Sequence, residues 1–197
     1  RIGGAEKVAA DIGFRADSQK YIVHYVVFGD EIGAYEPELE AHGCKIFHLS
    51  AEGFKDRAQW HHRAAILDHW WLVGAEILAG LKRLIRTYHY DVIHAHTMFN
   101  IGWVMFAGKL YGVPVRISHA HSALEEHRSL KVRLYESAMR FLILTCATDY
   151  IACGVKAGHR LYGREAFEKK GTLILNGIDT QVFAFDEQRR NTFRNEL

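Results

Sequence analysis

Short runs of apolar residues alternate along the chain with longer stretches in which apolar residues recur every three or four positions. The short runs are rich in β-branched and aromatic residues, and they predict strands at 21–28, 45–49, 91–95, 115–118, 149–153 and 172–175. Most of these runs are apolar throughout rather than at alternate positions. That pattern is typical of parallel strands that are covered on both faces.

The longer stretches predict helices at 7–14, 102–111, 130–145 and 186–197, and a further long helix that carries Trp70, Trp71, Ile77, Leu81 and Leu84. Within 130–145, Leu134, Ala138, Phe141 and Leu142 fall on one face, which we expect to be buried. Helices between parallel strands require right-handed crossovers, which place helices on both sides of the sheet. The sequence therefore predicts an α/β fold with a doubly wound, Rossmann-like parallel sheet.

Both ends of the chain depart from the pattern of a complete doubly wound domain. The chain opens on Gly3-Gly4 and a helix, whereas a glycine turn of this kind normally follows the first, central strand. The polar helix at 186–197 has no later strand on which to pack. We therefore expect a fragment, with 1–180 as one domain that lacks its first strand. Residues 181–197 are then a linker and the first helix of a second domain.

Composition narrows the classes of function. The chain has 25 Lys and Arg against 23 Asp and Glu, a net charge of +2 that does not favour nucleic-acid binding. The 49% of hydrophobic residues can form a large core, yet no run of about 18 apolar residues predicts a membrane span. The 3 cysteines show no C-x-x-C spacing, which favours a reducing, cytoplasmic environment.

The Gly3-Gly4 pair has two interpretations. Glycines let the backbone approach a ligand closely, and the helix that follows directs its free N–H groups to the same place, which suits a phosphate. A tight turn without a ligand explains the pair equally well.

Two identical tripeptides, His94-Ala95-His96 and His119-Ala120-His121, each close a predicted parallel strand. Open α/β sheets bind their ligands at the carboxyl ends of strands, and residues two apart on a strand face the same way. Such histidines can hold zinc, can act as acid, base or hydrogen-bond donor to a substrate, or can be structural residues of the core. We expect at least one of the four to be functional.

A basic and aromatic stretch precedes the long helix. It combines Lys55, Arg57 and Arg63 with Trp60, Trp70 and Trp71, a composition that suits a lipid interface. The competing interpretation, which we favour, places the tryptophans in the core or against the sheet.

Several segments, taken in order and with their spacing, resemble the N-terminal domains of retaining family 4 glycosyltransferases, in particular bacterial capsule and exopolysaccharide enzymes. The segments that carry the resemblance are GGAE at 3–6, DVIHAH at 91–96, VPVRISHAHS at 113–122, and LILNGID at 173–179 with Phe183 after it. The resemblance implies one half of a two-domain (GT-B) enzyme. Such an enzyme transfers a sugar from a nucleotide-sugar to a glycan or lipid-linked acceptor with retention, in polysaccharide biosynthesis.

The resemblance also implies roles for single residues. His119 would reach the reacting sugar as the catalytic residue, Gly3 and Gly4 would lie near the diphosphate, and His96 would line the acceptor side. The other substrate contacts expected from the same motifs are His121, Ser122 and Asn176. No metal and no cofactor other than the nucleotide-sugar is expected, and peripheral contact with the inner face of the membrane is a further hypothesis. The fragment alone is expected to be inactive.

Three alternatives remain open from the sequence. A metal-dependent hydrolase would use a His-x-His pair to hold zinc, usually on a (β/α)₈ barrel, which is longer than this chain. A non-catalytic module would bind a glycan or a nucleotide on the same fold. A nucleotide-sugar epimerase with the same two-domain architecture is the third alternative.

Overall fold

The computed structural model describes residues 3–29, 31–49, 63–96, 98–123, 129–178, 180 and 184–196, with the backbone alone for 63–70 and 72. Its strands are β1 (His24–Phe28), β2 (Lys45–Leu49), β3 (Val92–Ala95), β4 (Val115–Ala120), β5 (Asp149–Ala152) and β6 (Gly171–Leu173). Its helices are α1 (Gly4–Arg15), α2 (Glu36–Ala41), α4 (Arg63–Tyr88), α5 (Ile101–Leu110), α6 (Leu130–Cys146), α7 (Val155–Tyr162), α8 (Arg164–Lys170) and α9 (Glu187–Glu196). All six predicted strands are present, within three residues at either end.

Every strand pairing in the described part of the chain is parallel. β1 pairs with β2, and β3, β4, β5 and β6 pair in that order. Among the described residues no backbone ladder joins β1 to β3, although His24 Nδ1 of β1 lies 2.7 Å from the hydroxyl of Tyr90, just before β3. A first strand ahead of Arg1 stays a prediction.

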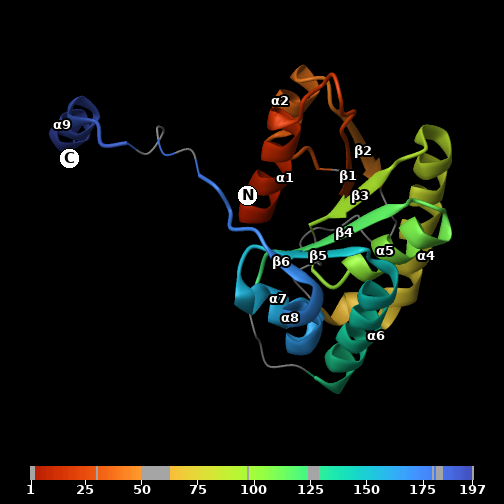
Figure 1. Cartoon of the computed structure of the whole chain (residues 1–197). Coiled ribbons are helices and arrows are strands. Elements are labelled where there is room, and N and C mark those ends of the chain that lie inside the picture. The colour runs from red at the N-terminus through yellow and green to blue at the C-terminus, as the bar shows by residue number, and fades with distance from the viewer. Residues whose placement is uncertain are drawn as a thin grey trace.

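Helices cover both faces of the sheet, as Figure 1 shows. On one face, the hydroxyl of Tyr25 in β1 donates a 2.8 Å hydrogen bond to the carbonyl of Ala9 in α1, and α1 packs against α2. On the other face, α5 packs between α4 and α6. Gly108 of α5 lies directly against the side chain of Ile93 in β3. The predicted doubly wound arrangement is therefore confirmed.

The core lies between the four-stranded group and the layer of α4, α5 and α6. Its fully buried members include Ile101 and Met105 of α5 and Met139 and Ile143 of α6. Of the four residues predicted to share one face of α6, Ala138 and Leu142 are partly buried against the core, whereas Leu134 and Phe141 are 71% and 66% exposed. The face that packs on α5 instead contains Glu136, Met139, Ile143 and Cys146, which are spaced three and four apart.

Two glycines of α5 give a prediction about the packing of this layer. A Cβ on Gly102 would lie 2.9 Å from the carbonyl oxygen and 3.1 Å from the Cα of Met139, which are backbone atoms of α6. A Cβ on Gly108 would meet only the side chains of Arg116 and Ile93, at 3.1 Å. Side chains move aside more easily than a helix backbone does.

We therefore expect Gly102→Ala to lower the free energy of unfolding by about 1–3 kcal/mol, because overpacking outweighs the better helix propensity of alanine. Gly108→Ala gains the same helix propensity, and it should leave the free energy of unfolding unchanged or raise it slightly. Urea unfolding of the two variants measures the difference. Equal stabilities would contradict the close packing of α5 on α6.

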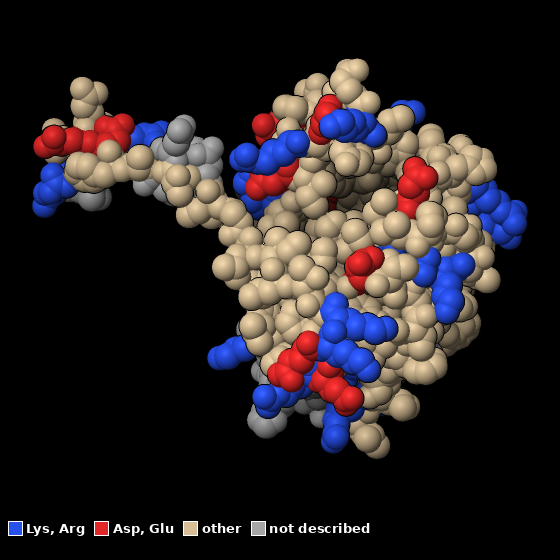
Figure 2. Space-filling model, viewed as in Figure 1, with Lys and Arg blue, Asp and Glu red and all other residues tan. Residues whose placement is uncertain are grey.

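Only some of the other residues singled out in the sequence lie in the part of the chain that the structure describes. In the described residues, no helix is long and apolar enough to span a bilayer. Lys55, Arg57 and Trp60 lie outside the described residues, as do Phe183 and the side chains of Arg63 and Trp70. Trp71 is 57% exposed and so is not a core residue. The division at residue 180 stays a prediction. Helix α9 has no buried residue and lies apart from the α/β body (Figures 1 and 2).

Candidate functional site

Four histidines converge at the carboxyl ends of the neighbouring strands β3 and β4. The parallel register pairs His94 with Ile117 and Ala95 with Ser118, so that the next residue, His96, lies level with His119. Since residues two apart on a strand share a face, His94, His96, His119 and His121 all project from the same side of the sheet. Ile93 and Ala95 project from the opposite side, where Ile93 contacts α5 and Ala95 belongs to the core.

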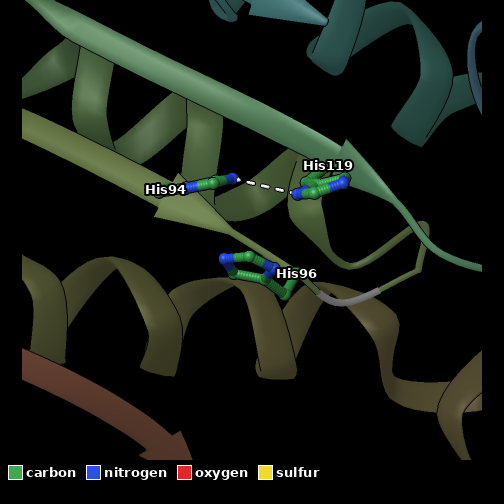
Figure 3. A group of neighbouring side chains, drawn as sticks. All are labelled: His94, His96 and His119. Carbon is green, nitrogen blue, oxygen red and sulfur yellow. Dashed lines mark hydrogen bonds between the residues drawn. The ribbon is translucent and has the colours of Figure 1, made fainter. Parts of the chain in front are cut away.

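Hydrogen bonds join the histidines of one strand to those of the other. His94 Nε2 lies 3.2 Å from His119 Nδ1, and His96 Nδ1 lies 2.9 Å from His121 Nε2. The rings of His94 and His119 stack at 8° with their centroids 5.3 Å apart, and those of His96 and His121 stack at 24° and 5.1 Å. Figure 3 shows the first of these bonds, with the ring of His96 beside it. We call these four residues the histidine cluster.

Burial keeps the histidine cluster neutral. Loss of hydration, and after it the positive charge that neighbouring histidines would carry, lower the pKa of His94 to about 4 and that of His119 to about 3. The pKa values of His96 and His121 are lowered as well, again chiefly by burial. Near pH 7 each ring therefore has one N–H donor and one nitrogen acceptor.

Two nitrogen atoms of the cluster are buried without a hydrogen-bond partner among the described residues. They are His119 Nε2 and His121 Nδ1. His119 itself is only 4% exposed. A buried nitrogen without a hydrogen bond costs free energy. A hydrogen bond from a bound molecule to either of these two atoms would therefore add most to its binding free energy.

The first turn of α1 lies close to the cluster. The negative charge of Glu6 acts on His121, where it opposes the lowering of the pKa by burial. Gly3 caps the helix in an extended conformation, with φ −103° and ψ 161°, and a Cβ there would collide with the carboxylate of Glu6. Neither Gly3 nor Gly4 has a positive φ, so neither adopts a backbone conformation that is restricted to glycine.

The other expected site residues lie in different surroundings. Ser122 follows His121 directly and is half-buried. Asn176 is exposed in the segment after β6, and among the described residues no hydrogen bond joins it to the histidine cluster. The structure thus brings together His96, His119 and His121, with Gly3 and Gly4 at the start of the adjoining helix, and leaves Asn176 outside this group.

Two residues that belong to the site had no role predicted from the sequence. His94 holds the ring of His119 through their shared hydrogen bond, and this bond couples the tautomers of the two rings. Glu6 is the charged residue of α1 that acts on the cluster. The repeat of the His-x-His motif was a signal for His94, because the same motif on a neighbouring strand places its members at hydrogen-bonding distance. For Glu6 the signal was its place in GGAE, in the first turn after the glycines.

The histidine cluster also has the composition of a metal site. One nitrogen from each of His94, His96 and His119 lies within 4.8 Å of the others. The arrangement can therefore offer neutral donors and acceptors to the hydroxyl groups of a substrate, or nitrogen ligands to an ion.

Comparisons with known proteins identify the family. Residues 2–182 match the family model of Glycosyltransferase Family 4. The chain is 29% identical over 185 residues to EpsF, a candidate glycosyltransferase of Bacillus subtilis (strain 168), with 92% of this chain and 44% of EpsF covered. It also resembles Anabaena Alr3699/HepE, crystallised in complex with UDP and glucose, with a TM-score of 0.65 and 17% identity.

That second similarity covers 100% of this chain and 47% of HepE, so the chain spans about half the length of each of these proteins. At this identity HepE shows the fold alone. The family match covers nearly the whole chain and contains every residue of the histidine cluster. The resemblance carried by the GGAE, DVIHAH and ISHAHS segments is thereby confirmed, and the chain belongs to Glycosyltransferase Family 4.

Proposed function

We propose that this chain is the acceptor-side half of a retaining glycosyltransferase that uses a nucleotide-sugar donor. The reaction replaces the diphosphate on the anomeric carbon of the sugar by the oxygen of an acceptor hydroxyl, whose proton is released. Family membership supports the reaction class, and the UDP and glucose in the HepE crystal support the class of donor. The observation that carries the proposal is the buried Nε2 of His119, which has no partner among the described residues.

His119 is the residue that we assign to the transferred sugar. Its Nδ1 is hydrogen-bonded to His94, so Nε2 is the ring nitrogen that is left for a bound molecule. If Nδ1 of His119 accepts the hydrogen bond from His94, its Nε2 carries the hydrogen and donates to a sugar oxygen. In the opposite tautomer Nε2 accepts from a sugar hydroxyl. In both cases a neutral ring at a fixed position orients the sugar, and no metal ion is needed for the transfer.

We place the acceptor beside the same cluster. His96 and His121 form the second hydrogen-bonded pair, and the unpartnered Nδ1 of His121 is suited to a hydroxyl group. Ser122 extends this row of polar groups. Gly3 and Gly4 begin helix α1, whose positive end favours an anion such as the donor diphosphate. Asn176, which is exposed, is assigned to a surface that a second domain would cover.

The biological setting is part of the proposal. We infer an enzyme of capsule or exopolysaccharide synthesis that acts in the cytoplasm on a glycan or lipid-linked acceptor. Trp71 is 57% exposed on α4 and follows a basic, tryptophan-rich stretch of sequence, which supports peripheral contact with a membrane. The complete enzyme should float with vesicles that contain anionic lipid, and recovery only in the soluble fraction would argue against this contact.

The proposed reaction can be tested on the complete enzyme with a panel of UDP-, GDP- and ADP-sugars and a lipid-linked acceptor. We expect one donor class to release its nucleoside diphosphate only when the acceptor is present. NMR of the product should show the same anomeric configuration as the donor. A product of inverted configuration would contradict retention, and the absence of diphosphate release with every donor would contradict the transferase itself.

A further inference from the structure

We propose that His94, His96 and His119 form a binding site for a divalent transition-metal ion, with Zn²⁺ as the preferred ion, and that His121 holds His96 in position for it. The ligand nitrogens of these three residues lie within 4.8 Å of one another. In a tetrahedral zinc site with bonds of about 2.0–2.1 Å, two nitrogen ligands lie roughly 3.3 Å apart. His94 Nε2 and His119 Nδ1 are separated by 3.2 Å, so they need almost no movement to share an ion.

The sheet holds the three ligands in place before any ion arrives. His94 belongs to β3, His119 belongs to β4, and the ladder between these strands runs from Val92–Val115 to Ala95–Ser118. His96 follows β3 directly, and its ring centroid is 4.1 Å from that of His94 and 5.2 Å from that of His119. Figure 3 shows the three rings grouped at the ends of the two strands. Ion binding therefore requires small side-chain movements and no rearrangement of the backbone.

The chemistry of the three ligands selects the class of ion. All are imidazoles, and burial keeps them in the neutral form that coordinates metals. Imidazole suits Zn²⁺, Ni²⁺ and Cu²⁺, whereas Mg²⁺ and Ca²⁺ require oxygen ligands, which these three residues do not supply. The site should therefore discriminate strongly against Mg²⁺ and Ca²⁺.

His121 completes the arrangement from outside the ligand set. The 2.9 Å bond between its Nε2 and Nδ1 of His96 fixes the ring of His96 and leaves the other nitrogen, Nε2, for the ion. A metal-bound histidine usually has its second nitrogen hydrogen-bonded in this way, and loss of such a partner lowers metal affinity about 10- to 100-fold. Glu6, whose negative charge acts on His121, favours positive charge at the same place.

A bound ion would change the proposed transferase, and this consequence rests on the proposed function. Three protein ligands leave one position of a tetrahedral ion open, directly beside the ring that we assign to the transferred sugar. An ion on Nδ1 of His119 would leave Nε2 in place, but it would put a positive charge and an additional, fourth ligand beside the transferred sugar. Zinc is therefore expected to inhibit the complete enzyme, and removal of zinc with EDTA should restore activity.

The test is a calorimetric titration of the metal-free, full 197-residue chain with Zn²⁺, and then with Mg²⁺. We expect one Zn²⁺ per chain and no detectable binding of Mg²⁺. His121→Ala should weaken zinc binding about 10- to 100-fold, and His94→Ala or His96→Ala should weaken it further. His159→Ala, which removes a half-buried histidine of α7 outside the cluster, is the matched control and should bind zinc like the unmodified chain.

A second measurement does not depend on the stability of the variants. Co²⁺ bound by three imidazoles in a tetrahedral site should give the unmodified chain strong visible absorption, and Zn²⁺ should abolish it. A chain that gives no such absorption and takes up no Zn²⁺ would overturn the inference. Undiminished zinc binding in folded His94→Ala and His96→Ala variants would overturn it as well.

Neither measurement needs a sugar or an acceptor. Transfer by an enzyme that does not bind zinc would therefore remove this inference and leave the proposed function intact. Conversely, zinc binding by an enzyme that transfers no sugar would remove the proposed function alone.

Discussion

Replacement of His119 by alanine in the complete enzyme is expected to lower kcat for sugar transfer about a hundredfold or more, in the range found when one hydrogen-bonding group at the reacting centre is removed. The ring is 4% exposed, and its Nε2 has no partner among the described residues. The proposed contact is therefore made in a site without bulk water, where a single polar contact has a large effect. Steady-state rates of nucleoside diphosphate release measure the loss.

The matched control is His24→Ala. His24 is likewise a histidine of the sheet, half-buried where His119 is buried, and its Nδ1 is hydrogen-bonded to the hydroxyl of Tyr90. It lies at the start of β1, and its ring contacts Phe47, Tyr88 and Tyr90 rather than the cluster. We expect this variant to lose stability but to keep kcat within a few-fold. Equal losses of kcat in the two variants would mean that His119 acts only through the stability of the sheet.

The largest expected loss of stability follows from Glu136→Ala. The carboxylate of Glu136 in α6 accepts a 2.6 Å hydrogen bond from the guanidinium of Arg160 in α7, and their side chains are only 11% and 7% exposed. Removal of the carboxylate leaves a buried arginine charge without this partner. Such a change costs about 3–5 kcal/mol in free energy of unfolding, which urea denaturation can measure.

An exposed ion pair in the same part of the molecule provides the comparison. Arg164 and Glu168 of α8 are joined at 2.9 Å, but their side chains are 80% and 54% exposed. Glu168→Ala should therefore cost no more than about 0.5 kcal/mol. In the double variant Glu136→Leu/Arg160→Leu, neither charge remains buried, and much of the lost stability should return. Similar losses in Glu136→Ala and Glu168→Ala would contradict the burial of the first pair.

Strands were predicted from the sequence more accurately than helix faces. The run 45–49 coincides with β2, because a short segment that carries Ile46, Phe47 and Leu49 directly after a glycine turn has few alternatives. The predicted strand at 21–28 began three residues early, and Tyr21 and Ile22 are 63% and 85% exposed. In α6 the large apolar side chains of Leu134 and Phe141 were expected to be buried, but both are exposed. The helix buries its narrower Met139–Ile143–Cys146 stripe because α5 approaches there, at Gly102.

Short helices were harder to predict for a different reason. The sequence analysis did not name α2, α7 or α8, which have 6, 8 and 7 residues. Segments of this length contain about two turns, too few for a helical period to stand out. Their stability comes from tertiary contacts such as those of the Tyr162 hydroxyl, which donates to the carbonyl of Ile151 at 2.9 Å and to that of Ser118 at 2.6 Å.

The candidate site could be found from the sequence, but its geometry could not. The two His-x-His motifs were recognisable because each closes a predicted strand. The contact between His94 and His119 depends on the pairing and register of β3 with β4, which the residues of either strand alone do not determine. The position of Glu6 beside His121 depends in turn on where α1 packs. Residues far apart in the chain thus formed the part of the site that the sequence did not reveal.

The contact between His119 and the transferred sugar is the central claim, and a double-mutant cycle tests it most directly. Each mono-deoxy analogue of the donor would be assayed with the unmodified enzyme and with His119→Ala. For one analogue, we expect removal of the hydroxyl to lower kcat/KM about tenfold in the unmodified enzyme and hardly at all in the variant, because the two changes remove the same hydrogen bond. If every analogue lowered kcat/KM by the same factor in both enzymes, His119 would not contact the sugar.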